Sequence, residues 1–321
     1  MRSPLLLFLL LLTGCDWDFG TGPSGRGSRF VSVAPGVSLE YVDHGGSGSP
    51  VVLLAGLGNT AHVYDGFAER LTGRHRVIAV TRRGYGRSSR PPAGYDLETL
   101  TSDLLAVLDR LGLDRVDLVG HSVAGDEMTR FAGRFPHRVR RLVYLDAAID
   151  RIDLAELIPY APVPPLPIRA ESLSVDGYRG YLDRVYGVRW PASEVLATTR
   201  FGADGRLIGP ATPGTISAAI IGGLVRPAYA AVRAPALGIY PVARTVTDIA
   251  AWLVPSAPDW DDALQYLTLG WQPFTADQRT RFRTGVVGST VLEIDGGNHF
   301  VFLSHPDRVA DAIARFLDAG A

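Results

Sequence analysis

Cysteine is almost absent from this sequence of 321 residues, which contains a single one, Cys15. The rest of the chain therefore has no disulfide, no thiol nucleophile and no cysteine-based metal site. An excess of positive charge is also missing, because 32 Lys and Arg residues stand against 33 Asp and Glu residues. Proteins bind a phosphate backbone through such an excess, so nucleic acid is not expected as a partner.

The apolar run near the N-terminus is too short to span a membrane. Arg2 precedes the unbroken run Leu5–Leu12, whereas a bilayer core requires about 20 apolar residues. A short apolar run after a positive charge is typical of a secretory signal. We therefore expect an exported protein without a permanent transmembrane helix at this end.

The run ends in Leu12-Thr13-Gly14-Cys15, which resembles the lipobox of bacterial lipoproteins. The resemblance implies that residues 1–14 are a signal peptide and that Cys15 carries acyl chains that anchor the protein to a bacterial membrane. Each buried CH₂ of such chains contributes about 0.8 kcal/mol. Residues 15–28, with several Gly and Ser, then form the lipidated cysteine and a flexible tether. The alternative is an ordinary secretory signal with a cysteine present by chance.

From Arg29 onward, short apolar or β-branched runs alternate with helical periodicity, which is typical of βαβ units. We predict an α/β fold with an eight-stranded, mostly parallel sheet flanked by helices, two of them over Leu97–Leu111 and Pro306–Leu317. The first two strands flank Pro35-Gly36 and are expected as an antiparallel hairpin at one edge. The predicted strands are Phe30–Val33, Ser38–Val42, Val51–Leu54, Val77–Val80, Val116–Val119, Leu142–Leu145, Ala236–Tyr240 and Val291–Ile294.

Residues 151–233 interrupt this pattern with a proline-rich stretch followed by helical segments. Their length exceeds the usual connections of a compact α/β unit, so we predict a helical cap inserted between two core parts, residues 29–150 and 234–321. Its apolar and aromatic residues favour a hydrophobic acyl or aromatic substrate, although they would serve equally to pack the cap on the core. These residues are Tyr160, Tyr178, Tyr181, Tyr186, Trp190, Ile220 and Ile221.

The most informative motif follows the predicted strand Val116–Val119, where the chain continues Gly-His-Ser-Val-Ala into a helical pattern. A serine on such a tight strand-to-helix turn has a strained backbone and needs small residues two places before and after it. Gly120 and Ala124 meet this requirement. Ser122 is thus the candidate nucleophile, and the main-chain N–H of Val123 is a candidate oxyanion donor. The neighbouring histidine, His121, is expected to pack behind Ser122.

Two further segments supply the groups that a serine nucleophile needs. After the third strand, Ala55-Gly56-Leu57-Gly58 allows the main chain to present the N–H of Leu57 as a second oxyanion donor, although a plain glycine-rich turn is the alternative. Just after the last predicted strand stands His299. A serine hydroxyl is a poor nucleophile unless an imidazole takes its proton, and His299 is the candidate base.

The acid that would orient His299 is less clear from the sequence. Asp146 ends the sixth strand, and Asp248 follows the seventh strand by eight residues, in a loop that would have to fold back. We prefer Asp146 and keep Asp248 as the alternative. Asp146 would also suit a purely structural role as a hydrogen-bonding residue at a strand end.

Together these motifs make residues 29–321 resemble the α/β-hydrolase fold superfamily, in which Ser, Asp and His follow in this order. The run Arg83-Gly84-Tyr85-Gly86-Arg87-Ser88 is similar to a turn found after the superfamily's fourth strand. The resemblance implies attack by Ser122 on a carbonyl, an acyl-enzyme cleared by water, and no metal or organic cofactor. A serine nucleophile disfavours a haloalkane dehalogenase or an epoxide hydrolase.

The resemblance indicates the mechanism better than the substrate. A hydrophobic carboxylic ester is the expected substrate. A thioester, a lactone, an amide or a carbon–carbon bond would suit the same residues. A hypothesis of another class is a catalytically silent lipoprotein that binds a small ligand, which is favoured by the missing carboxylate directly after the seventh strand.

Overall fold

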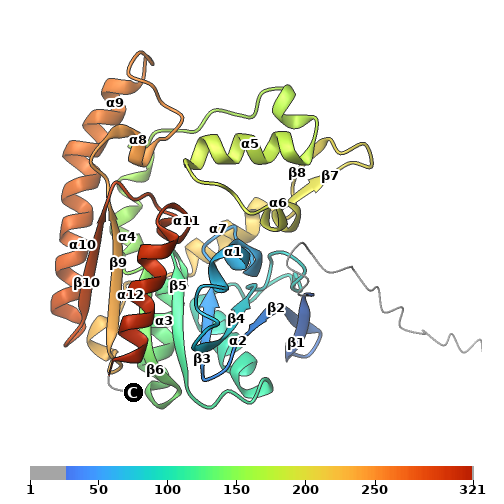
Figure 1. Cartoon of the computed structure of the whole chain (residues 1–321), viewed down its shortest axis with the longest axis vertical. Coiled ribbons are helices and arrows are strands. Elements are labelled where there is room, and N and C mark those ends of the chain that lie inside the picture. The colour runs from blue at the N-terminus through green and yellow to red at the C-terminus, as the bar shows by residue number, and fades with distance from the viewer. Residues whose placement is uncertain (1–26, 320–321) are drawn as a thin grey trace, which may run out of the picture.

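The computed structural model describes residues 27–319 (Figure 1). The predicted signal peptide, Cys15 and nearly all of the predicted tether therefore lie outside the described residues. Within residues 27–319, every helix is too short or too polar to cross a bilayer.

A single eight-stranded sheet forms the centre of the molecule, with the strand order β1-β2-β4-β3-β5-β6-β9-β10. β1 pairs antiparallel with β2, and β2 with β4, while the remaining neighbours are parallel. The predicted fold class and the antiparallel hairpin at one edge are confirmed. The strands are β1 (Arg29–Ala34), β2 (Val37–Gly45), β3 (Ser49–Leu54), β4 (His75–Val80), β5 (Val116–His121), β6 (Val139–Leu145), β9 (Ala236–Val242) and β10 (Thr290–Asp295).

The two faces of the sheet are apolar because successive side chains of a strand point to opposite sides. In β5 every residue is buried; Leu118 packs into one core cluster and Val119 into the other. The first cluster lies under α2 (Leu97–Arg110), α3 (Ala124–Arg134) and α10 (Gln272–Gly285), and the second under α1 (Asp65–Ala68) and α12 (Pro306–Asp318). A sheet buried on both faces explains the nearly continuous apolar runs of its central strands.

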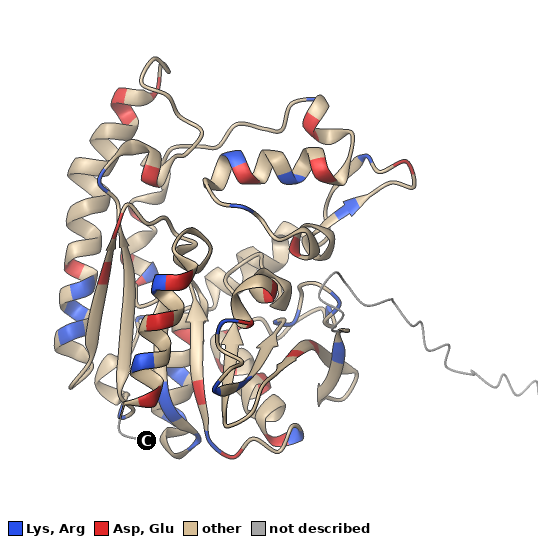
Figure 2. Cartoon of the chain, in the orientation of Figure 1, with Lys and Arg blue, Asp and Glu red and all other residues tan. Residues whose placement is uncertain are grey.

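The two predicted helices agree with α2 and α12 to within one residue at each end. Asp96 caps α2 by accepting a hydrogen bond from the N–H of Thr99 at 2.9 Å. The chain leaves α2 through Gly112, which has a φ of 65° that favours glycine. Charges of both signs interleave along the outer helices (Figure 2), and Arg281 pairs with Asp277 one turn away on α10.

Two long connections leave the sheet at the carboxyl ends of its strands (Figure 1). The one between β6 and β9 contains the predicted cap residues, and it includes an antiparallel pair of strands that we did not predict. The turn between them contains Gly205, whose φ is 78°, and the N–H of Gly202 binds the carbonyl oxygen of Arg206 at 2.8 Å. The elements of this connection are α4 (Arg151–Leu154), α5 (Val175–Tyr186), α6 (Ala192–Thr198), β7 (Thr199–Phe201), β8 (Leu207–Pro210) and α7 (Gly214–Gly222), with short 3₁₀ turns.

The second long connection joins β9 to β10 and precedes the strand that leads to His299. It carries α8 (Val246–Ile249), α9 (Trp260–Gln265), a π-helical turn over Tyr266–Trp271, and α10. α10 returns to cover the sheet, where Phe282 is fully buried. The remainder of the connection lies at the same end of the sheet as the inserted segment.

Candidate active site

Ser122 occupies the turn between β5 and α3 with a φ of 55°. Among residues 27–319 only Ser122 and Asp146, with a φ of 46°, combine a side chain with a positive φ, a conformation that is strained for most residues and clusters at functional sites. The turn is tight, because a Cβ on Gly120 would lie 3.0 Å from the Cβ of Ala124. A Cβ on Gly125 would lie 2.0 Å from the carbonyl oxygen of Ala147, so glycine lets α3 approach the chain beside Asp146.

Asp146 and His299 are joined by a hydrogen bond of 2.7 Å between Oδ2 and Nδ1. Asp146 is buried, with 2% of its side chain exposed, while 43% of the His299 side chain is exposed. A carboxylate accepts, so Nδ1 of His299 carries the proton and Nε2 of the neutral ring is free to accept one. The ends of β5 and β6 set this geometry, since Ser122 N–H binds the Leu145 carbonyl at 3.2 Å.

The alternative acid, Asp248, holds a different group. Its carboxylate accepts hydrogen bonds from the N–H groups of Arg244 at 2.7 Å and Thr245 at 2.8 Å, which caps α8. Asp248 lines the same cavity as His299, but among the described residues its carboxylate is bound by main-chain N–H groups and not by His299. The helix cap uses the Asp248 carboxylate, while Asp146 already binds Nδ1 of His299.

His121 packs behind the nucleophile and supports His299. Its ring lies 4.5 Å from the His299 ring, centroid to centroid, and its Nε2 is 2.9 Å from the main-chain carbonyl oxygen of His299. A carbonyl only accepts, so Nε2 donates. Burial, and then the neighbouring His299, lower the pKa of His121 well below its ordinary value, so this ring stays neutral.

The loop after β3 passes directly beside Ser122. A Cβ on Gly56 would lie 3.2 Å from the Cβ of Ser122 and 2.7 Å from Nδ1 of His121, so a larger residue would displace the loop. Within the described part of the chain, no hydrogen bond uses the main-chain N–H of Leu57 or of Val123. Both candidate oxyanion donors are therefore available to a ligand.

The structure contains no hydrogen bond between Ser122 Oγ and His299 among the described residues. Ser122 is half-buried, and the turn leaves its hydroxyl without a side-chain partner in that range. Catalytic hydrogen bonds are often long in unliganded sites and tighten when substrate binds.

A cavity of about 270 Å³ adjoins the Asp146–His299 pair. It lies between the proline-rich part of the inserted segment, the end of α5 and the β9–β10 connection, and its walls are mostly apolar. Four of its aromatic residues were not predicted from the sequence. Three of them lie between the last two predicted strands, and the unusual length of that connection was a usable signal. Its aromatic walls are Tyr186, Trp252, Tyr266, Trp271 and Phe300.

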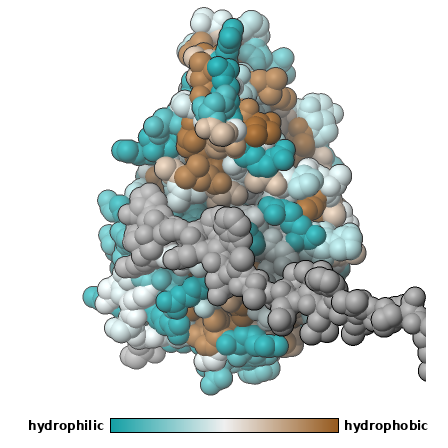
Figure 3. Space-filling view, turned by 90° about the vertical axis from the view of Figure 1, so that its right-hand side faces the viewer, coloured by the Kyte–Doolittle hydropathy of each residue, from teal (hydrophilic) through white to brown (hydrophobic). Residues whose placement is uncertain are grey.

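Of the aromatic cap residues predicted to bind substrate, some lie at the cavity and others are exposed to solvent. Tyr186 lines the cavity, and Trp190 stacks on Tyr186 at 4.7 Å. Tyr160, in contrast, is 74% exposed. Apolar surface is visible in the upper half of the molecule, at the level of the inserted segment (Figure 3). Among residues 27–319 no cluster of three or more His, Cys, Asp or Glu side chains has the arrangement of a metal site.

The chain matches the family model for the alpha/beta hydrolase fold over residues 49–173. It is 43% identical over 128 residues to a 2-hydroxy-6-oxo-2,4-heptadienoate hydrolase of Pseudomonas putida, which covers 39% of this chain and 46% of that protein. It is 40% identical over 104 residues to a putative non-heme haloperoxidase of Mycobacterium phage D29, which covers 32% of this chain and 37% of that protein. The chain therefore matches less than half the length of these two relatives.

Among solved structures, E-2-(acetamidomethylene)succinate hydrolase resembles the chain with a TM-score of 0.68 and 23% identity. The match covers 92% of this chain and 100% of that one, and at this identity it bears on the fold alone. Together, the family match over residues 49–173 and the strand order support the α/β-hydrolase fold for this chain.

Proposed function

We propose that the protein is a serine hydrolase that cleaves a carboxylic ester through an acyl-enzyme on Ser122. The observation that carries this proposal is the 2.7 Å hydrogen bond from His299 Nδ1 to the buried Asp146, beside a serine held at a φ of 55°. A base oriented by a buried carboxylate next to a serine on a strained turn is the arrangement that activates a hydroxyl.

In the proposed mechanism Ser122 Oγ attacks the carbonyl carbon while Nε2 of His299 takes its proton. The N–H groups of Leu57 and Val123 stabilise the resulting oxyanion. The C–O bond to the leaving group then breaks, and His299 returns the proton to the departing alkoxide. A water molecule, deprotonated by His299, releases the acid. Asp146 holds the ring in the required tautomer and stabilises its charged form.

The cavity beside His299 supports an apolar substrate. Its aromatic walls would bury an acyl chain or a ring, and each buried CH₂ contributes about 0.8 kcal/mol. The relative from Pseudomonas putida is named as a hydrolase of 2-hydroxy-6-oxo-2,4-heptadienoate, so a substrate with another scissile bond is the second candidate.

The test of this proposal is hydrolysis of p-nitrophenyl esters of increasing acyl length by the full chain, together with labelling by a fluorophosphonate probe. We expect turnover and labelling in the wild type, and neither in Ser122→Ala. A wild-type protein that neither hydrolyses these esters nor reacts with the probe would favour the silent ligand-binding lipoprotein. The lipid anchor on Cys15 stays a proposal, which metabolic labelling with a palmitate analogue would test against Cys15→Ser.

A further inference from the structure

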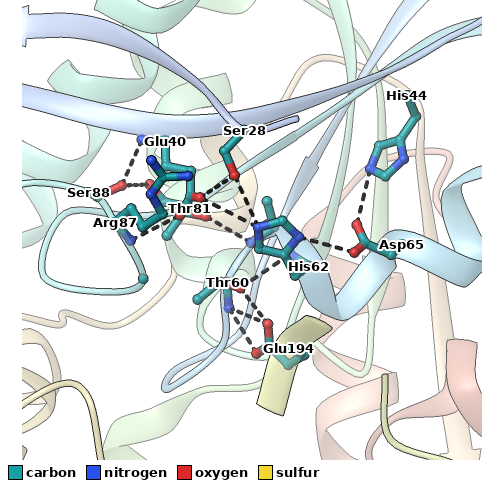
Figure 4. Close-up of polar contacts among 12 residues, drawn as sticks. Ser28, Glu40, His44, Thr60, His62, Asp65, Thr81, Arg87, Ser88 and Glu194 are labelled. Carbon is teal, nitrogen blue, oxygen red and sulfur yellow. Dashed lines mark hydrogen bonds and ion pairs between the residues drawn. The ribbon is translucent and has the colours of Figure 1, made fainter. Parts of the chain in front are cut away.

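Glu194, on α6 of the inserted segment, is a fully buried carboxylate outside the proposed triad. It accepts hydrogen bonds from Asn59 Nδ2 at 3.0 Å, from the N–H of Thr60 at 3.0 Å and from the hydroxyl of Thr60. Figure 4 shows the contacts with Thr60. A side chain of the inserted segment thus binds two consecutive residues of the loop that follows β3.

Burying an acidic side chain to attach α6 to the core costs desolvation free energy. Burial raises the pKa of Glu194 to about 7, although hydrogen bonds from Thr60 and Asn59 and the charge of His62 oppose this shift. An apolar side chain of similar size would dock a helix without this desolvation penalty, as the adjacent and fully buried Val195 does. The hydrogen bonds therefore point to a task beyond docking.

The bound loop is the one that carries a proposed oxyanion donor. The N–H of Asn59 closes a turn onto the carbonyl oxygen of Gly56 at 3.3 Å, so Leu57 lies inside this turn. On its other side the guanidinium of Arg82 binds the carbonyl oxygens of Ala55 at 2.9 Å and Gly56 at 3.3 Å. A cation therefore holds the carbonyls at the start of the loop.

At the end of the loop Glu194 accepts hydrogen bonds, whereas Arg82 donates them at its start. Asn59 is 6% exposed and Thr60 is fully buried, so these donors lack access to water as a substitute partner. Leaving a buried donor unpaired costs about 1–3 kcal/mol. Without Glu194 we expect the loop to shift until its donors find other partners.

We propose that Glu194 is a positioning residue, which holds Asn59 and Thr60 and thereby fixes the Gly56–Leu57 main chain against Ser122. The inserted segment would in this way add to the contacts of the core that hold the oxyanion site. This inference rests on the proposed serine mechanism, because the orientation of Leu57 matters only if an oxyanion forms.

The test compares Glu194→Leu, which fills the space but accepts no hydrogen bond, with Glu194→Gln, whose amide oxygen can still accept from Asn59 Nδ2 and from the N–H of Thr60. A misplaced oxyanion donor costs about 10²-fold in rate. We expect Glu194→Leu to lower kcat by about this factor with KM nearly unchanged, and Glu194→Gln to restore most of the loss. Asn59→Ala, which removes one of the two links and keeps the fold of α6, should lower kcat by about tenfold.

Two readouts separate positioning from a merely structural role. A trifluoromethyl ketone forms a tetrahedral adduct with a serine, so its affinity should fall in Glu194→Leu by the same factor as kcat/KM. The matched control is Asp183→Leu, which removes the acceptor of the same segment that binds the N–H of Trp190 at 2.6 Å. This control should lower the melting temperature without changing kcat.

Each outcome has a definite meaning. If the wild type and Asp183→Leu are active and Glu194→Leu and Asn59→Ala match them in kcat, the positioning role is wrong while the serine mechanism stands. The same holds if Asp183→Leu loses as much kcat as Glu194→Leu, since the loss then follows the stability of the segment. If the wild type neither reacts with the fluorophosphonate nor turns over ester, both proposals fail together.

Discussion

Two histidine–carboxylate groups of this molecule contain the same types of residue but leave the histidine in opposite protonation states. His299 binds one carboxylate, Asp146, through Nδ1, and 43% of its side chain is exposed. His62 binds Asp65 through Nδ1 at 3.1 Å, while its Nε2 faces Ser28 at 3.3 Å and Glu40 at 3.5 Å (Figure 4). Ser28, His62 and Asp65 thus repeat the residue types of the proposed triad.

Glu40, a second carboxylate beside His62, accounts for the different protonation of the two histidines. Burial lowers the pKa of His62, but hydrogen bonds from the ring to Asp65 and Glu40, and the charges of these carboxylates, outweigh it and raise the pKa to about 10. His62 therefore stays protonated near neutral pH and has no lone pair with which to take a proton from Ser28. A general base requires one oriented nitrogen and one free nitrogen, and His299 has both.

The largest expected contrast between the two groups lies in their serines. Ser122→Ala should lower kcat for ester hydrolysis on the order of 10⁶-fold, because the nucleophile is lost. Ser28→Ala should leave kcat unchanged. Steady-state kinetics with p-nitrophenyl butyrate would measure both, and a large loss in Ser28→Ala would break the comparison.

Of the two candidate acids, Asp146 should matter more for kcat than Asp248. Asp146→Asn should lower kcat by about 10⁴-fold, because the ring then adopts the wrong tautomer and its charged form is not stabilised. Asp248→Asn should lose far less, since an amide oxygen can still accept the hydrogen bonds from the N–H groups of Arg244 and Thr245. Rates for the two variants, measured side by side, would contradict the assignment if Asp248→Asn were the weaker enzyme.

The cavity next to His299 should affect substrate choice more than catalysis. Trp252→Ala removes an apolar wall, so kcat/KM should fall by about tenfold for an octanoyl ester relative to an acetyl ester. Trp260→Ala serves as the control, because Trp260 lies in the same connection but does not line the cavity. An equal loss for both esters in Trp252→Ala would argue that the cavity does not hold the acyl chain.

The smallest effect on activity is expected at His62, whose role is in stability. Since its pKa is raised in the folded state, its stabilisation is complete below pH 6.5 and is lost as the pH rises toward 10. The free energy of unfolding by urea should therefore fall across this range in the wild type and less steeply in His62→Gln. The exposed His137→Gln should keep the wild-type slope; an unchanged slope in His62→Gln would be inconsistent with this account.

The sheet and the strand-end residues were predictable from the sequence because both depend on local pattern. Apolar runs fix the strands, and Gly120 with Ala124 marks the turn that carries Ser122. The carboxyl ends of parallel strands meet at one edge of the sheet, so Asp146 after β6 and His299 after β10 were expected at the same edge. The sequence could not separate Asp146 from Asp248, because a short distance from His299 does not follow from position along the chain.

Other parts depend on contacts between distant segments. Glu194 and Thr60 are 134 residues apart, and no repeat or motif marks Glu194 in the sequence. The same holds for Trp252 and Trp271, which line the cavity through a connection of irregular structure. The β7–β8 pair was missed because its strands have three and four residues, too short to show an alternating pattern.

The most direct test of the central claim is to trap the intermediate. The full chain is mixed with a p-nitrophenyl ester, quenched in acid within milliseconds, digested and examined by mass spectrometry. The account predicts that the acyl mass appears on the peptide that contains Ser122, at a level that rises with an initial burst of p-nitrophenol. An acyl group on another residue, or turnover without any acylated peptide, would contradict it.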